Sequence, residues 1–243
     1  EAKNYLSDDF LIRQLYYPYR LWVNKVQKQV VPVFLVYSNG VFSLYEYQFS
    51  APERYNSLML VKQKNYCIEA VDISLEDIVS LLNSAPIVQE PEVSFPQAND
   101  FKRVINLCEL LLQNDMIMDE ITQNYAFDPR QTNYYTDAGR YLGLISKNRV
   151  NGEVTYSLTD EGRKAIQLPY KPRQLKFAEK ILEHRVFSET LKLYLKYAQA
   201  PPKQEVIQVM RASSLYQVEA DSTFERRAST IISWINWILH LQR

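Results

Sequence analysis

Hydrophobic and polar residues alternate in two ways along the first 85 residues. The run VVPVFLVYS is almost wholly apolar, which predicts a buried central strand, whereas VFSLYEYQF alternates as a half-exposed strand does. Asn39-Gly40 stands between the two runs and predicts the tight turn of a β-hairpin. A further strand is predicted within NSLMLVKQKNYCIEA, with Lys62 and Lys64 outward. With a short strand at residues 1–3, these runs predict a mixed sheet that includes one crossover helix.

The crossover helix is predicted over residues 10–17, with the sequence SDD at its start. Pro18 then either kinks this helix or marks its restart. Leu11, Leu15 and Trp22 are expected on one apolar face. The side chains that project elsewhere are Arg13, Gln14, Tyr17 and Arg20.

The segment that follows predicts one more helix and then a break. In SLEDIVSLLNSA an acid follows Ser74 by three residues, which predicts a capping box and a short helix. Residues 86–99 contain Pro86, Pro91 and Pro96 and have no periodicity. This stretch is therefore expected to be a linker between domains.

The segment after the linker predicts three helices and two strands. The first helix begins at Asp100, the second is MDEITQNYA, and the third begins at Asp128 with Pro129 in its first turn. Two strands, within LISKN and EVTYSLT, flank a turn at Asn151-Gly152. Three helices followed by a two-stranded wing is the pattern of a winged helix.

In a winged helix the third helix enters the major groove of DNA by its N-terminal half. That half carries side chains that hydrogen-bond base edges or phosphates, namely Arg130, Gln131, Asn133 and Tyr134. Lys147 and Arg149 on the wing would reach the DNA backbone. Winged helices also serve as protein docking modules, and this alternative stays open.

The last segment, residues 169–243, predicts several helices that end in a long apolar one, arranged in a manner typical of a helix-turn-helix. Ser222 and Glu225 predict a capping box at the start of the final helix. Arg226 and Arg227 then lie in its first turns, where they would contact phosphate or pair with nearby carboxylates. The sequence does not separate these two roles.

The composition adds limits on function. The 243 residues have a formal net charge of zero, so DNA binding must come from local patches rather than from overall charge. Cys67 and Cys108 are too few for a disulfide framework, and His184 and His240 stand apart from other metal ligands, so free buried thiols in a reducing cytoplasm are expected. No apolar run is long enough to predict a membrane span.

The N-terminal tripeptide carries candidate chemistry. Alternation places Glu1 and Lys3 on the same face of the first strand. A carboxylate there can hold a divalent cation, and a lysine can orient or activate the attacking water in a metal-dependent nuclease. Glu-x-Lys alone is common, so its context decides its meaning.

With its continuation, this stretch resembles the second half of a PD-(D/E)xK nuclease core, as found in a group of Type II restriction endonucleases. The resemblance rests on EAKN, DDFLIRQLYYPYRLW and PVFLVYSNGVFSLYEYQF, and continues into FPQANDFKRVINLCELL and FDPRQTNYYTDAGRYLGLI. The family's first acidic residue, an Asp on the preceding strand, has no counterpart here. The chain is therefore expected to be an N-terminally truncated fragment.

The resemblance implies Mg²⁺-dependent cleavage of both strands of double-stranded DNA. Glu1 would ligate the metal, and Lys3 and Gln14 would complete the catalytic group. Arg13, Tyr17 and Arg20 would border the DNA backbone. The resemblance also implies a homodimer, because two strands need two active sites, and a cognate methyltransferase in the same system.

The expected fold class is α+β and multidomain. It comprises a partial restriction-endonuclease-like core at 1–85, a linker at 86–99, a winged helix-turn-helix at 100–168 and a helical domain at 169–243. Two alternative functions stay open: a non-catalytic DNA-binding regulator with an α/β sensing or dimerisation domain, and a protein-interaction module within a defence complex.

Overall fold

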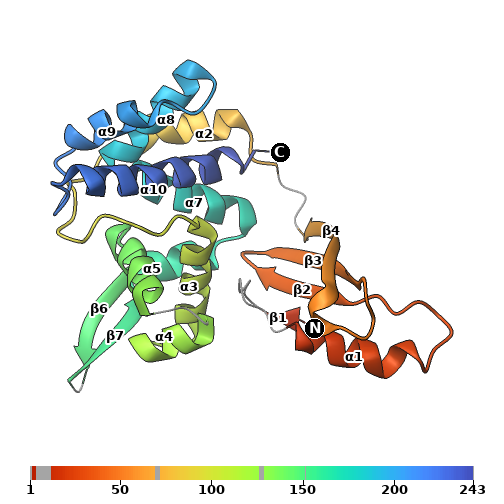
Figure 1. Cartoon of the computed structure of the whole chain (residues 1–243). Helices are drawn as coiled ribbons and strands as arrows, with labels where there is room; N and C mark the ends of the chain where they lie inside the picture. Colours follow the sequence, from red (N-terminus) through yellow and green to blue (C-terminus); the bar gives the residue numbers. More distant parts are fainter. Residues whose placement is uncertain (1, 4–11, 69–71, 126–128, 151, 243) are drawn as a thin grey trace. The chain divides into compact units, whose positions relative to one another are not determined.

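The computed structural model describes residues 2–3, 12–68, 72–125, 129–150 and 152–242. About 53% of the described residues are helix and 19% are strand, which confirms a mixed α and β protein. Figure 1 shows both kinds of element. The chain forms two compact units, Glu1–Ala70 and Val71–Arg243, and each is described by itself.

The first unit is a four-stranded sheet with one long helix. Its strands lie in the order β1-β2-β3-β4, and β1 is parallel to β2 while the other neighbours are antiparallel. The predicted mixed sheet with a crossover helix is therefore confirmed. The elements are β1 (Ala2–Lys3), α1 (Arg13–Val23), β2 (Val33–Ser38), β3 (Val41–Phe49), a 3₁₀ turn (Tyr55–Ser57) and β4 (Leu58–Cys67).

The hairpin turn and the core of this unit follow from local chemistry. Asn39 and Gly40 both have positive φ, 53° and 75°, which is the two-residue turn that Asn-Gly favours. Phe34 and Val36 of β2 are buried, and their neighbours on the strand are not. The expectation of a strand buried throughout is therefore wrong, because α1 covers one face of the sheet, with Leu15 in the shared core.

Helix α1 differs from its prediction at both ends. It begins at Arg13 and continues through Pro18 to Val23, so the proline neither ends nor restarts it. Trp22 is 51% exposed, and the predicted apolar face is wrong at this position. The aromatic rings of Tyr16 and Tyr19 cover the core instead. Leu11 lies outside the described residues.

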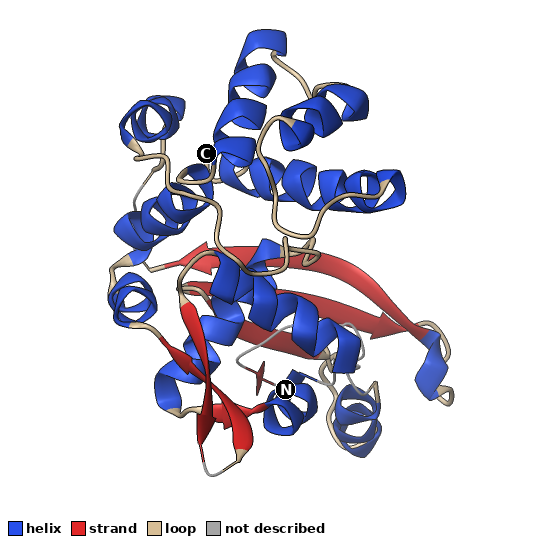
Figure 2. Cartoon of the chain, turned by 90° about the vertical axis from the view of Figure 1, so that its left-hand side faces the viewer, coloured by secondary structure: helices blue, strands red, loops and turns tan. Residues whose placement is uncertain are grey.

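The second unit contains the remaining helices and a three-stranded sheet (Figures 1 and 2). The elements are α2 (Leu75–Ser84), α3 (Phe101–Gln113), β5 (Met116–Ile117), α4 (Met118–Tyr125), α5 (Pro129–Tyr141), β6 (Ile145–Val150), β7 (Glu153–Leu158), α6 (Asp160–Gln167), α7 (Tyr170–Leu182), α8 (Arg185–Tyr197), α9 (Lys203–Arg211) and α10 (Asp221–Leu239).

Helices α3, α4 and α5 pack together beside the sheet, whose strands lie in the order β5-β7-β6. The side chains that meet include Leu111, Ile121, Ala138 and Tyr156, which are at most 1% exposed. Figure 2 shows β6 and β7 as a hairpin that extends beyond the helices. The predicted helices and the hairpin are present. Strand β5, which no sequence signal marked, joins the sheet between α3 and α4.

The cap signals had mixed outcomes. Ser74 accepts a hydrogen bond from the amide of Asp77, whose carboxylate accepts one from the Ser74 amide in return, so this capping box is confirmed. Helix α5 begins at Pro129 as predicted, and Asp128 lies outside the described residues. The capping box predicted at Ser222 is wrong, because α10 begins one residue earlier and no side chain caps it.

Residues 86–99 form no helix or strand, yet they belong to the core of the second unit. Phe95 and Ala98 are buried, and Phe95 stacks on Phe187 of α8 with ring centroids 5.9 Å apart. The indole of Trp234 donates a hydrogen bond of 2.7 Å to the carbonyl of Ala98. Helix α2 also packs in this unit, against α7, although the sequence analysis grouped it with the first sheet.

Candidate nucleic-acid interface

Helix α5 presents one polar face. Thr132, Tyr135 and Thr136 point inward and are buried, and the hydroxyls of Thr122 and Thr132 join α4 to α5 at 2.8 Å. Arg130, Gln131 and Asn133 are exposed, and Tyr134 is half-buried. The helical period therefore places the first three predicted DNA-reading side chains on the outer surface.

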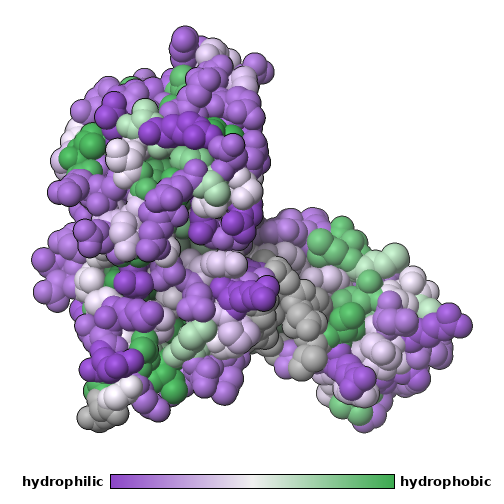
Figure 3. Space-filling model, turned by 60° about the vertical axis from the view of Figure 1, so that its left-hand side comes forward, coloured by the Kyte–Doolittle hydropathy of each residue, from purple (hydrophilic) through white to green (hydrophobic). Residues whose placement is uncertain are grey.

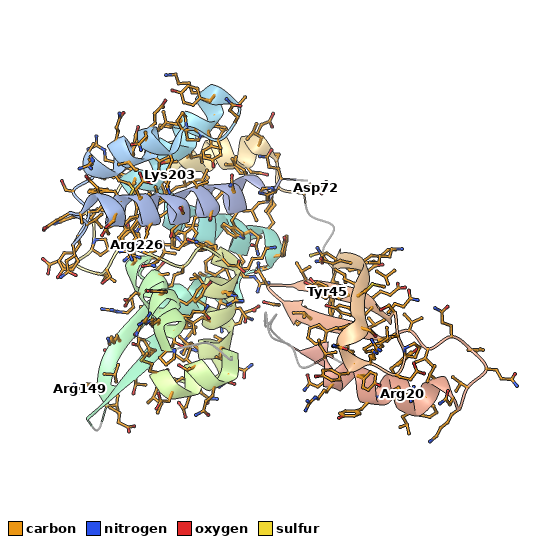
Figure 4. All side chains as sticks on the ribbon, viewed as in Figure 1. Arg20, Tyr45, Asp72, Arg149, Lys203 and Arg226 are labelled. Carbon is orange, nitrogen blue, oxygen red and sulfur yellow. The ribbon has the colours of Figure 1, made fainter. Side chains whose placement is uncertain are left out.

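The wing brings two further cations to this part of the chain. Lys147 and Arg149 are exposed on β6, opposite Tyr156 and Val154 of β7 (Figure 4). Their positions alternate with that of Asn148, so the two cations share one face of the hairpin. The ammonium of Lys147 lies 5.8 Å from the centre of the Tyr156 ring. Both cations therefore lie on the exposed part of the hairpin, beyond its buried residues Ile145 and Leu158.

Arg226 and Arg227 differ in their environments. The guanidinium of Arg227 is partly buried and donates a hydrogen bond of 2.6 Å to the side-chain carbonyl of Gln97. Burial lowers the pKa of Arg227, as does the charge of Arg226, while Tyr134 and Asp137 of α5 act in the opposite sense. Arg227 therefore links residues 86–99 to α5.

Arg226 is exposed on the outer side of α10, and its Nε donates to the carbonyl of Ser222 at 3.3 Å (Figure 4). One of the carboxylates expected to pair with these arginines, Asp221, instead pairs with Arg211. Arg226 is thus the member of the pair that can reach an external phosphate.

The predicted catalytic residues of the first unit are described only in part. Glu1 lies outside the described residues, and the backbone of Lys3 pairs with Val36 at the edge strand β1. Gln14 lies on α1, and its side-chain oxygen is buried without a hydrogen-bond partner among the described residues. Such an oxygen suits a hard cation or an N–H donor.

Within the described ranges, no three His, Cys, Asp or Glu side chains lie together as a metal site would require. The predicted carboxylate ligand, Glu1, lies outside the described residues.

The other three side chains assigned to DNA contact in the first unit lie on α1. Arg13 and Tyr17 are exposed, and the guanidinium of Arg13 lies over the ring of Tyr55 at 5.4 Å. Arg20 is half-buried, donates to the carbonyl of Pro52 at 3.3 Å and pairs with Glu53 at 3.8 Å. Part of its charge is therefore already compensated.

One buried polar cluster was missed by the sequence analysis. His184 is 3% exposed, and its Nδ1 lies 3.5 Å from the carboxylate of Glu90, which also accepts a hydrogen bond of 2.6 Å from Tyr141. The rings of Tyr141 and His184 stack 4.1 Å apart. Burial, followed by the charge of Glu90, raises the pKa of Tyr141 well above its ordinary value. The three residues are far apart in sequence, so no spacing could have grouped them.

Residues 103–243 match a family model described as Domain of unknown function (DUF7226), which is more than half of the chain. The chain belongs to this family. Its DUF7226 part contains α5, the wing and α10. Residues 1–67 match a second model, Domain of unknown function (DUF6997). No curated protein and no solved structure matches the chain. Among the described residues, no helix is long and apolar enough to cross a membrane.

Proposed function

We propose that the DUF7226 part is a winged helix that binds double-stranded DNA through α5 and the β6–β7 wing. The observation that carries the proposal is the element order α3-β5-α4-α5-β6-β7 with Arg130, Gln131 and Asn133 exposed on α5. Arginine and asparagine make bidentate hydrogen bonds to guanine and adenine edges. Lys147 and Arg149 on the wing then contact phosphates and fix the register.

We further propose that the first unit is the second half of a PD-(D/E)xK nuclease core in a Type II restriction endonuclease. Support comes from β1, which is parallel to β2, is followed by α1 and lies at the edge of the sheet. Among the described strands, β1 has β2 as its one neighbour. This proposal includes the division of the chain into a nuclease core, a winged helix-turn-helix and a C-terminal helical domain.

In this proposal Glu1 would ligate Mg²⁺, and the bound ion would supply an activated water and neutralise charge on the scissile phosphate. Lys3 stabilises the developing negative charge beside the phosphate. Gln14, on helix α1, belongs to the proposed catalytic group, where its side-chain oxygen would accept a hydrogen bond from a nearby N–H. Cleavage of both strands is assigned to a homodimer, and protection of the host site to a cognate methyltransferase.

The first test is duplex binding by the full chain, measured by fluorescence anisotropy over a range of salt concentrations. Arg130→Ala is expected to weaken binding to a selected site by about 5- to 150-fold, because a base contact contributes about 1–3 kcal/mol. Arg149→Ala is expected to weaken all duplexes alike and to reduce the salt slope by about one. Lys192→Ala, which removes a cation from α8, is the control and should change neither quantity.

Three results separate the proposals. Binding that is lost with Arg130→Ala supports the DNA-reading role of α5. Equal effects of Arg130→Ala and Lys192→Ala would contradict it and leave overall electrostatics as the cause. Negligible affinity of the wild type for any duplex would favour the protein-interaction alternative.

A further inference from the structure

Helix α1 has an outward face of large apolar side chains. Tyr17 is 63% exposed, Leu21 53% and Trp22 51%. Arg13, Tyr17 and Leu21 are spaced by four residues and so lie along one line of the helix, with Trp22 beside it. Figure 3 shows hydrophobic surface on the first unit among hydrophilic atoms. Large apolar side chains exposed together on one short helix indicate an interaction site.

This surface is also cationic. Residues 12–68 contain seven lysines and arginines and two acidic residues, Glu46 and Glu53, and residues 12–45 contain no acidic residue. Positive charge stands beside the exposed rings: Arg13 lies over Tyr55 at 5.4 Å, and the ammonium of Lys25 lies 5.9 Å from the Trp22 ring. The chain is neutral overall, so this is a local concentration of positive charge.

Exposed aromatic rings beside cations favour one kind of binding partner. A second copy docked on this face would bring the same cations together, and Glu53, two residues before Tyr55, already pairs with Arg20 at 3.8 Å. Duplex DNA would meet the cations but would keep its bases stacked and away from Tyr17 and Trp22. A strand with unpaired bases satisfies both features, because its phosphates neutralise the cations and its bases stack on the rings.

We propose that the α1 aromatic face, made of Arg13, Tyr17, Leu21, Trp22, Lys25 and Tyr55, binds single-stranded DNA. Unpaired bases stack on Tyr17 and Trp22, and phosphates lie near Arg13 and Lys25. This inference rests on the proposed function in taking DNA as the ligand, but it assigns a different surface and a different form of DNA. In a nuclease, such a face would hold a strand opened near the site of cleavage.

Tryptophan fluorescence of the full chain provides the test. Of the three tryptophans, Trp234 is fully buried and Trp237 packs against Phe101 at 4.4 Å, so quenching by DNA reports mainly on Trp22. The probe is an oligothymidylate of about 15 nucleotides. We expect it to quench the wild type, and we expect Trp22→Ala to remove that quenching.

Affinity is then measured by anisotropy of the labelled oligothymidylate. Tyr17→Ala and Trp22→Ala should each weaken binding about 5- to 150-fold, because stacking of one base on an aromatic ring contributes about 1–3 kcal/mol. Trp22→Phe should retain most of the affinity. Tyr216→Ala removes an exposed tyrosine from the second unit and should have no effect. All three positions are exposed, and unchanged circular dichroism confirms folding.

Unchanged affinity in both Tyr17→Ala and Trp22→Ala would overturn the proposal. So would self-association of the wild type that these variants abolish, since a second copy would then cover the face. Arg130→Ala distinguishes this proposal from the duplex-binding one: it should weaken binding of the duplex and leave that of the oligothymidylate unchanged. A wild type that binds the oligothymidylate but no duplex refutes the winged-helix proposal alone.

Discussion

Substitution by alanine should have different effects at the adjacent residues Arg226 and Arg227. It should lower the stability of the fold at Arg227 and weaken DNA binding at Arg226. Arg227→Ala removes a charged hydrogen bond of 2.6 Å to Gln97 and the link from residues 86–99 to α5. A hydrogen bond to a charged group contributes about 1.5–3 kcal/mol. Because Arg227 is only partly buried, solvent screening reduces this figure, and we expect the free energy of unfolding to fall by about 1–2 kcal/mol.

Arg226→Ala changes an exposed side chain and should alter that free energy by no more than about 0.5 kcal/mol. Its effect should lie in DNA binding, where the loss of one phosphate contact reduces the salt slope by about one. Arg227→Lys keeps the charge but loses the planar array of donors, so it should resemble Arg227→Ala.

The assay is urea unfolding followed by the fluorescence of Trp234 and Trp237, which both lie in the second unit, together with duplex binding at several salt concentrations. The reasoning is refuted if the two alanine variants lose equal stability. It is also refuted if Arg227→Ala lowers the salt slope while leaving stability unchanged, because Arg227 would then be the phosphate contact.

Three further predictions concern the described residues. Burial raises the pKa of the Cys108 thiol to about 12, so in the native chain only Cys67 should react rapidly with a thiol reagent; two rapid equivalents would contradict this. A Cβ at Gly162 would lie 2.1 Å from a backbone carbonyl oxygen, so Gly162→Ala should cost about 1–3 kcal/mol in thermal unfolding, and a neutral result would contradict that close approach. The hydrogen bond from Lys171, and next that from the Ser74 amide, lowers the pKa of Asp77 below its ordinary value of 3.8. The Asp77 carboxylate therefore stabilises the fold above that pH and loses this effect as the pH falls through the lowered pKa, so Asp77→Asn should be destabilising at pH 7 but not at the acid end; a pH-independent difference would refute this.

Short-range signals predicted the elements well because their causes are local. Asn39 and Gly40 adopt the positive φ values that a two-residue hairpin needs, and Ser74 caps α2 through its own first turn. Pro129 begins α5 because its missing N–H has no partner at a helix start.

Signals failed where a distant segment decides the environment. Trp22 was expected on the apolar face of α1, but it is exposed because Tyr16 and Tyr19 cover the core of the first unit. His184 is buried beside Glu90, which comes from a segment that looked like a linker. Residues 86–99 pack because Phe95 and Ala98 fit between helices that occur later in the chain.

The sequence predicted some residues of the candidate site better than others. Residue type alone selected Arg130, Gln131, Asn133 and Tyr134; the first three are exposed and Tyr134 is half-buried. Neighbouring arginines in one helical turn could not be told apart, because the difference between Arg226 and Arg227 arises from contact with Gln97. The predicted catalytic role of Glu1 and Lys3 stays a prediction.

The central claim is that DNA binding by this chain serves cleavage at a site held by Glu1 and Lys3. Its most direct test is Mg²⁺-dependent digestion of a mixed-sequence plasmid by the protein. The wild type should give discrete fragments, and Lys3→Ala should bind the same DNA with unchanged affinity and leave it intact. A wild type that binds DNA but cleaves none of it with Mg²⁺ or Mn²⁺ would contradict the account and favour a non-catalytic regulator.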